Sequence, residues 1–221
     1  MFVGHFALGF AAKRAAPRTS LATLFAAAQL ADLAWPVLLA AGLEQVRIEP
    51  GNTPFTPLDF VSYPYSHSLL TLVLAGVLFA AVYRAATGRN GRMMALLAGL
   101  VVSHWALDWV THRPDLPLYP GGPRVGLGLW NHVGWTIAIE LIMFAAGLWV
   151  YARATRPRDG IGRWAFLALW VLLLLSYASS IVSPPPPTVA SLIAVAMIGS
   201  VVIVVLAWWS DSHRAPNDGA W

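Results

Sequence analysis

The sequence predicts an all-α, polytopic integral membrane protein with about six transmembrane helices and a short N-terminal helix that is interfacial or re-entrant. The chain of 221 residues is 58% hydrophobic and only 11% charged, whereas a soluble globular domain is usually about 25% charged. Its mean hydropathy is +0.64. Its apolar residues form separate runs, each near the ~20 residues that a helix needs to cross a bilayer. We therefore expect a single transmembrane domain over residues 1–221, with membrane lipids and no nucleic acid as partners.

The first apolar run is MFVGHFALGFAA, and it is too short to span a bilayer. A signal peptide places its positive charges before the apolar stretch. Here Lys13 and Arg14 follow the stretch instead. We expect residues 1–12 to stay in the mature protein and to lie in the interface or re-enter the bilayer.

Six longer apolar runs follow, and each is expected to be one span. Their approximate bounds are 20–43, 66–86, 92–111, 131–152, 162–182 and 188–209. Pro36 is the clearest hinge within a run, and Ser66 is the expected N-cap of the second span. The last two runs lack ionisable residues in their apolar cores. The chain is thus expected to divide into polar-site-bearing helices over 1–152 and an apolar helical pair over 160–210, which could pack against a second copy.

The basic residues orient these spans through the positive-inside rule. Eleven of the fourteen fall on one side of the predicted topology: Lys13, Arg14, Arg18, Arg84, Arg89, Arg92, Arg153, Arg156, Arg158, Arg163 and Arg214. Only Arg47, Arg113 and Arg124 fall on the other. We expect a protein of the bacterial cytoplasmic (inner) membrane with both termini in the cytoplasm.

The third span carries the most informative polar residues, His104, Asp108 and His112, within SHWALDWVTH. Spacings of four place their side chains on nearly one face of a helix. An acid or base near the middle of a bilayer costs roughly 2.5–3.5 kcal/mol on insertion scales. Such residues are therefore retained for a bound ion, a proton path or a buried polar network.

Metal binding is the function that this pattern favours first. The spacing resembles the paired ligands of helical metal sites, and Asp32 and His67 on other helices could complete the ligand set. At 1.5 Å of rise per residue, Asp32, His104 and Glu140 lie at similar depths. Glu140 could act as a general base or as a further ligand. The chain has no cysteine, so imidazole and carboxylate ligands favour Zn, with Mn and Fe(II) as alternatives.

Two other readings fit the same residues. Intramembrane histidines and carboxylates also serve in proton relays and ion paths, so the chain could be a transporter. Polar side chains also hold membrane helices together by hydrogen bonds, so the cluster could be structural. His112 stands directly before Arg113-Pro114, which ends the helix, and His132 opens the fourth span. Each of these two histidines could be an interfacial residue rather than a ligand.

Four short motifs resemble those of bacterial membrane-bound metal-dependent hydrolases, including the LexA-regulated inner-membrane type. They are GHFALG with His5, LADLAWP with Asp32, SYPYSHSLL with His67, and SHWALDWVTH with His104 and Asp108. The family pattern has a second Asp where Ala34 stands, and a His-Arg pair where Ser62 and Tyr63 stand.

This resemblance, over roughly residues 1–140, implies a membrane-embedded hydrolase. It adds His5 to a ligand set that then comprises His5, Asp32, His67, His104 and Asp108. Glu140 and Asp108 are the expected catalytic residues, and a divalent metal is the expected cofactor. A site in the outer half of the bilayer suits a lipid or a lipid-linked ester or phosphoester.

Overall fold

A computed structural model gives the fold of residues 1–88 and 91–217. Five of its helices are long and apolar enough to cross a membrane. They are α4 (Leu69–Thr87), α5 (Gly91–Thr111), α6 (Val133–Ala154), α7 (Gly160–Val182) and α8 (Val189–Ser212). The chain is an all-α polytopic membrane protein, as the sequence predicts.

The run expected as the first span is not one continuous helix. It consists of α2 (Leu21–Ala28) and α3 (Leu30–Ala40), which meet at Gln29 with a bend of 61°. The two helices together have the length and hydropathy of a sixth span. The expected hinge at Pro36 is wrong, because Pro36 lies inside α3 and the backbone leaves helical geometry at Gln29.

Helix α1 (Val3–Ala12) lies inside the bundle rather than on its surface. It packs against α2, α5 and α6, and His5, Phe6 and Phe10 are all buried. A methyl group on Gly147 of α6 would lie 2.7 Å from the Cα of Ala7, so the two backbones are in direct contact. Residues 1–12 therefore contain a short helix that is buried among the other helices.

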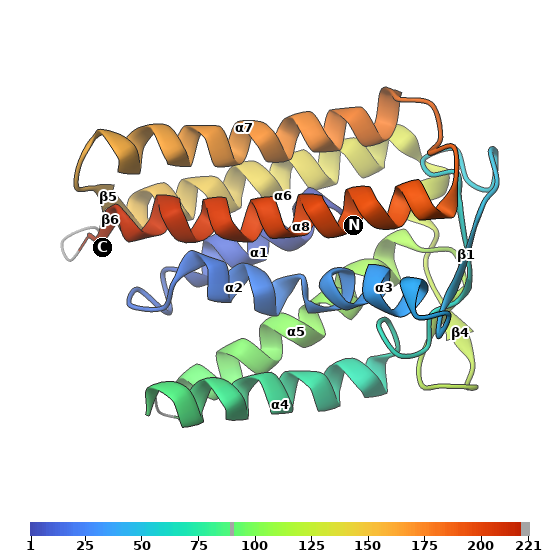
Figure 1. The fold of residues 1–221 in the computed structure, drawn as a ribbon, viewed down its shortest axis with the longest axis horizontal. Coiled ribbons are helices and arrows are strands. Elements are labelled where there is room, and N and C mark those ends of the chain that lie inside the picture. The colour runs from blue at the N-terminus through green and yellow to red at the C-terminus, as the bar shows by residue number, and fades with distance from the viewer. Residues whose placement is uncertain (89–90, 218–221) are drawn as a thin grey trace.

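The remaining helices surround α1 in pairs (Figure 1). Helices α4 and α5 pack together, as do α7 and α8, while α3 packs on α8. The C-terminal ends of α4 and α8 and the start of α5 lie at one end of the molecule, and strands β1 and β4 lie at the other. Most of the basic segments counted above are at the first end; Arg89 lies outside the described residues.

Three short two-stranded sheets, which the sequence did not predict, close the ends of the bundle. β1 (Gln45–Ile48) pairs with β2 (Leu58–Ser62), and β3 (Leu116–Pro117) pairs with β4 (Arg124–Val125). β5 (Thr155–Pro157) pairs with β6 (Arg214–Pro216). A 3₁₀ turn, η1 (Leu129–Asn131), precedes α6. All three pairs are antiparallel. They satisfy backbone groups of the connections outside the long helices.

Local capping explains where several helices begin. Ser20, Ser68, Asp159 and Thr188 cap α2, α4, α7 and α8 through side-chain oxygens that accept backbone N–H bonds. The expected cap at Ser66 is wrong, because α4 begins two residues later and Ser68 caps it. Ser66 is thereby free for the contacts described below.

A buried ion pair fixes the C-terminal end of α1. Lys13 Nζ lies 2.6 Å from Asp211 Oδ2 and donates to the carbonyl oxygen of Thr19 at 2.8 Å. Asp211 also accepts from the Tyr151 hydroxyl at 2.8 Å and from the Leu21 N–H at 3.1 Å. This carboxylate, in the last turn of α8, thus joins four parts of the chain.

Candidate metal centre

Five residues that the sequence singled out meet in one cluster. They are His5 of α1, Asp32 of α3, His67 just before α4, and His104 and Asp108 of α5. They form two overlapping groups that share His104, and the ligand atoms within each group lie within 4.8 Å of one another. The Asp32 side chain is 38% exposed, whereas His67 and Asp108 are at most 5% exposed. Access to the cluster is therefore from the Asp32 side.

Four of the distances among His67, His104, Asp32 and Asp108 lie between 3.1 and 3.8 Å. His67 Nε2 lies 3.4 Å from Asp32 Oδ1 and 3.8 Å from Asp108 Oδ2. His104 Nε2 lies 3.7 Å from Asp32 Oδ1 and 3.1 Å from Asp108 Oδ2. Ligands about 2.1 Å from a tetrahedral zinc ion are separated by about 3.4 Å. His67, His104 and Asp32 form one metal-capable group with distances near this value, whereas Asp108 belongs to the other group, which it forms with His5 and His104.

The break between α2 and α3 sets the tautomer of His104. Ala28 ends α2, where a carbonyl has no partner within its own helix. That oxygen lies 2.9 Å from His104 Nδ1 and can only accept, so Nδ1 carries the proton. In the neutral ring the lone pair is then on His104 Nε2, which is buried and lies 3.1 Å from Asp108 Oδ2. A neutral imidazole with its proton on Nδ1 can bind a metal through Nε2.

A second hydrogen-bond chain sets the tautomer of His67. The Ser66 hydroxyl donates to Glu44 Oε2 at 2.6 Å, and its oxygen lies 2.7 Å from His67 Nδ1. Since Ser66 has only one proton and gives it to the carboxylate, its oxygen accepts from the His67 Nδ1–H. Glu44 Oε1 also accepts the N–H groups of Tyr65 and Ser66, both at 2.8 Å. In the neutral ring the lone pair is therefore also on His67 Nε2, which lies 3.4 Å from Asp32 Oδ1.

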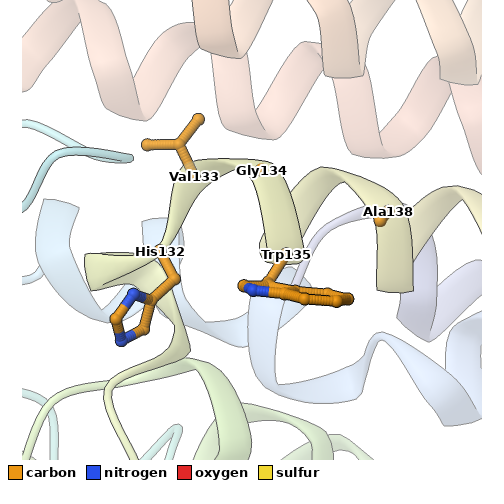
Figure 2. A pocket seen from close by; sticks show the side chains of 5 residues that line it. All are labelled: His132, Val133, Gly134, Trp135 and Ala138. Atoms are coloured by element: carbon orange, nitrogen blue, oxygen red, sulfur yellow. The ribbon is translucent and has the colours of Figure 1, made fainter.

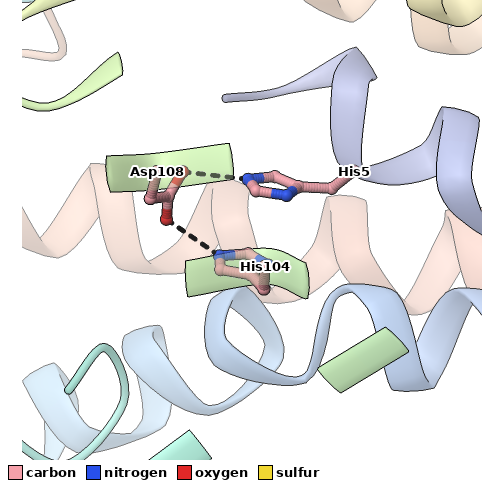
Figure 3. A group of neighbouring side chains, drawn as sticks. All are labelled: His5, His104 and Asp108. Atoms are coloured by element: carbon pink, nitrogen blue, oxygen red, sulfur yellow. Dashed lines mark hydrogen bonds and ion pairs between the residues drawn. The ribbon is translucent and has the colours of Figure 1, made fainter. Parts of the chain in front are cut away.

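His5 approaches the cluster from the opposite side of Asp108 (Figure 3). Its Nε2 lies 3.0 Å from Asp108 Oδ1, while Asp108 Oδ2 faces His104. The His5 and His104 rings stack with centroids 3.7 Å apart and an angle of 5° between their planes. The Met1 amino group also contacts Asp108 Oδ1 and donates to Thr111 Oγ1 at 3.2 Å. His5 thus supports Asp108, and a ligand role for His5 stays a prediction.

Glu140 lies near this group but faces α1. Its Oε2 accepts the N–H of Phe2 at 2.8 Å and the N–H of Gly4 at 3.1 Å. Its Oε1 is buried without a hydrogen-bond partner among the described residues. Glu140 belongs to neither of the two metal-capable groups found there. A role as general base therefore stays a prediction.

His112 belongs to a separate network at the strand-bearing end of the bundle. Its Nδ1 lies 2.9 Å from Asp115 Oδ1, which also accepts the Tyr63 hydroxyl at 2.8 Å. Burial lowers the pKa of His112, so the ring is neutral near pH 7. Burial alone raises the pKa of Asp115, but the hydrogen bonds from His112 and Tyr63 and the charge of Arg113 outweigh burial and hold that pKa below its usual value. Burial and the Asp115 carboxylate raise the pKa of Tyr63 well above its usual value, so its hydroxyl stays a donor.

His132 is exposed at the start of α6 and is not part of the cluster. It lines a shallow, open recess with Val133, Gly134, Trp135 and Ala138 (Figure 2). Trp135 is 69% exposed there, as expected of an aromatic side chain at a membrane interface. The recess contains one titratable side chain, so we assign no chemistry to it.

Sequence reasoning missed Glu44, Ser66 and the carbonyl of Ala28. The sequence pointed to Ser66 only as a helix cap and did not single out Glu44, and a main-chain carbonyl carries no sequence signal. Only the proximity of Ser66 to His67 in the chain could have pointed to their hydrogen bond. Such outer partners commonly change metal affinity by about 10–100-fold.

Replacing Ser66 by alanine is expected to weaken zinc binding by about 10–100-fold. The change removes the acceptor that holds the His67 Nδ1–H and leaves Nε2 free to take the proton. Competition with a chelator, followed by mass spectrometry of the retained metal, measures the loss. Ser68→Ala is the matched control, since Ser68 caps α4 and its side chain bonds Thr71 rather than the cluster. Equal metal affinities in the Ser66 and Ser68 variants would contradict the tautomer argument.

No family model, curated protein or solved structure matches the chain.

Proposed function

We propose that this chain is a membrane-embedded, metal-dependent hydrolase that acts on a lipid or a lipid-linked ester or phosphoester. The observation that carries the proposal is the meeting of two imidazole lone pairs with two carboxylates in one small volume. His67 Nε2 and His104 Nε2 face Asp32 and Asp108 at 3.1–3.8 Å. In their neutral tautomers these imidazoles would turn lone pairs toward the carboxylate oxygens, and a divalent cation among them would replace that repulsion by coordination.

The residues of this set define what the site would offer. His67, His104, Asp32 and Asp108 would hold Zn, with Mn or Fe(II) as alternatives, because all four ligands are nitrogen or oxygen. A bound divalent metal supplies Lewis acidity and lowers the pKa of a coordinated water. The half-exposed Asp32 gives the only partly open side among the four ligand side chains. Its carboxylate is therefore placed where a substrate could reach the site.

A cavity of about 320 Å³, which no residue of the cluster lines, supports the binding of an anionic group at this end of the bundle. Arg124 and Tyr63 are among its lining residues, and the Tyr63 ring lies 5.3 Å from the His67 ring. Among the described residues, Arg113 is paired with Asp59 and Asp115, whereas no carboxylate pairs with Arg124. An arginine without an acidic partner at the edge of a bilayer suits the phosphate of a lipid head group.

Replacing Arg124 by glutamine is expected to weaken the binding of phosphatidic acid three- to tenfold, because one charge-assisted contact is lost. Native mass spectrometry with defined lipid additions measures this, with diacylglycerol as the uncharged comparison. The control is Arg47→Gln, because Arg47 is exposed on β1 and does not line this cavity. Equal losses in both variants would mean that only the net charge of the surface matters.

Localisation and assembly belong to the same proposal. The uneven distribution of basic residues supports a bacterial inner-membrane protein with both termini in the cytoplasm. Val195, Ile198 and Val202 are among the exposed apolar residues of α8, so this helix could meet lipid or a second copy of the chain. The motif resemblance described above supports the hydrolase class.

The structure favours the hydrolase over an ion path. A path would need polar groups that continue from the cluster to the basic end of the bundle. The next buried polar group in that direction along α1 is Lys13, about 12 Å from His5. Phe6 and Phe10 occupy that length and pack against Phe25. A purely structural network remains the main alternative, because the ionic contacts of Asp108 also join α1 to α5.

The deciding experiment is the metal content of the purified protein beside the double variant His104→Ala/Asp108→Ala. About one metal per chain, lost in a double variant that still folds, is the result expected of a metal site. Hydrolysis of phospholipid and carboxyl-ester panels by the loaded protein then tests the reaction. Absence of metal from both proteins after reconstitution with Zn, Mn and Fe(II) would overturn the proposal in favour of a structural network.

A further inference from the structure

We infer that Glu140 is a positioning residue that docks the internal helix α1 and so brings His5 to Asp108. This inference rests on the proposed metal site for its functional meaning. It gives Glu140 a different role from that of general base, and it makes the cluster conditional on the placement of α1.

Helix α1 has no side-chain cap of its own. Its N-cap residue is Phe2, which offers no acceptor, and no side-chain hydrogen bond caps the helix from within. Exposed N–H groups at a helix start need acceptors, and the interior of a membrane has no water to provide them. Glu140 of α6 supplies that acceptor by bonding the Phe2 and Gly4 N–H groups. A carboxylate at this position also complements the positive end of the helix dipole.

The rest of α6 continues the same contact. Glu140, Phe144 and Gly147 lie on the buried face of α6, at spacings of four and three residues. Phe144 packs on Phe10, and Gly147 lets the α6 backbone meet Ala7. Glu140 is therefore the polar end of a stripe that holds α1 along its length.

His5 follows directly after the residue that Glu140 holds. The Gly4 N–H is bonded to Glu140, and the next residue stacks on His104 and hydrogen-bonds Asp108. Loss of the carboxylate releases the first turn of α1, and His5 moves with it. Asp108 then loses one of its partners on the Oδ1 side, which weakens the ligand set from outside the four-atom group.

The absence of cysteine gives a direct test, because one introduced thiol is unique in the chain. Val3 lies in the first turn of α1 with 0% exposure, so Val3→Cys reports whether this turn is docked. The rate of its reaction with a maleimide in detergent is compared in the parent, Glu140→Ala and Glu140→Gln backgrounds. Asp115→Asn is the matched control, since it removes a buried carboxylate that bonds Tyr63, His112 and Arg113 rather than α1. Metal content is measured in the cysteine-free proteins.

We expect Glu140→Ala to raise the labelling rate at least about tenfold, because two charge-assisted hydrogen bonds are lost. Metal content should fall below about half, Glu140→Gln should give intermediate values, and Asp115→Asn should label like the parent. If Glu140→Ala does not fold, Glu140→Gln decides the question. Unchanged labelling in the Glu140 variants would overturn the inference, even if hydrolysis were lost. The labelling result is independent of metal, so a protein that binds no metal would refute the proposed function and still test the docking of α1.

Discussion

Replacing Asp211 by alanine is expected to lower the free energy of unfolding by about 3–5 kcal/mol, the usual cost of removing one partner of a buried ion pair. The Lys13 ammonium would be left without its carboxylate, and the Tyr151 hydroxyl and the Leu21 N–H would lose their acceptor. Thermal or denaturant unfolding in a fixed detergent measures the difference. Asp159→Ala is the control, because that carboxylate caps α7 at the surface and should cost much less. Similar losses in the two variants would contradict a central role for the buried pair.

The loss of free energy of unfolding in the Asp211→Ala variant should also depend on pH. Burial lowers the pKa of Lys13 from its usual value near 10.5, and the Asp211 charge opposes that effect in the parent protein. Without Asp211 the folded-state pKa falls further. Between that lowered pKa and 10.5 the unfolded chain binds more protons than the folded chain, so folding stability rises with pH in this window. If the difference in free energy of unfolding between parent and variant stays constant from neutral pH to pH 10, the pKa of Lys13 does not fall when Asp211 is removed.

Substitution of Gly147 by alanine is expected to destabilise the protein by about 1–3 kcal/mol, although alanine is the better helix former. Its methyl group would press on the Cα and carbonyl oxygen of Ala7, and these backbone atoms cannot rotate away. Gly134 of α6 provides a matched control, since a Cβ there would meet nothing within 4 Å. Gly134→Ala should therefore be neutral or stabilising by up to about 1 kcal/mol.

Unfolding of the Gly147→Ala and Gly134→Ala variants in the same detergent measures whether each change raises or lowers the free energy of unfolding. Equal effects at Gly147 and Gly134 would mean that α1 does not press on α6. Displacement of α1 by Gly147→Ala should also increase the labelling of Val3→Cys, which connects this prediction to the docking role of Glu140.

The candidate site shows how far the sequence can lead. The spacing of four residues in an apolar helix was enough to place His104 and Asp108 on one face. The free-energy cost of polar groups in a bilayer then indicated Asp32 and His67 as further candidate ligands. Neither argument contains the distance between residues on different helices. The separate network around His112, one turn beyond Asp108, shows that helical spacing alone does not decide which residues meet.

The sequence did not predict the path of the backbone at two helix ends. The bend at Gln29 gives His104 a carbonyl acceptor, and the turn before α4 gives His67 its contact with Ser66. Both contacts set a proton on Nδ1 and leave Nε2 for the cluster. They depend on where helices stop, which a few backbone torsions determine and which residue patterns specify only loosely.

The amino-acid sequence by itself determined the membrane class and the long helices, because hydrophobicity and the length of apolar runs are local properties that a bilayer tests one segment at a time. It also identified the ionisable residues whose free-energy cost in a bilayer calls for a functional or structural role. Tertiary structure alone decided that α1 lies inside the bundle, that Glu140 caps it and that His5 meets Asp108. Those contacts join residues more than 100 positions apart. They arise from the packing of helix faces, to which the whole bundle contributes.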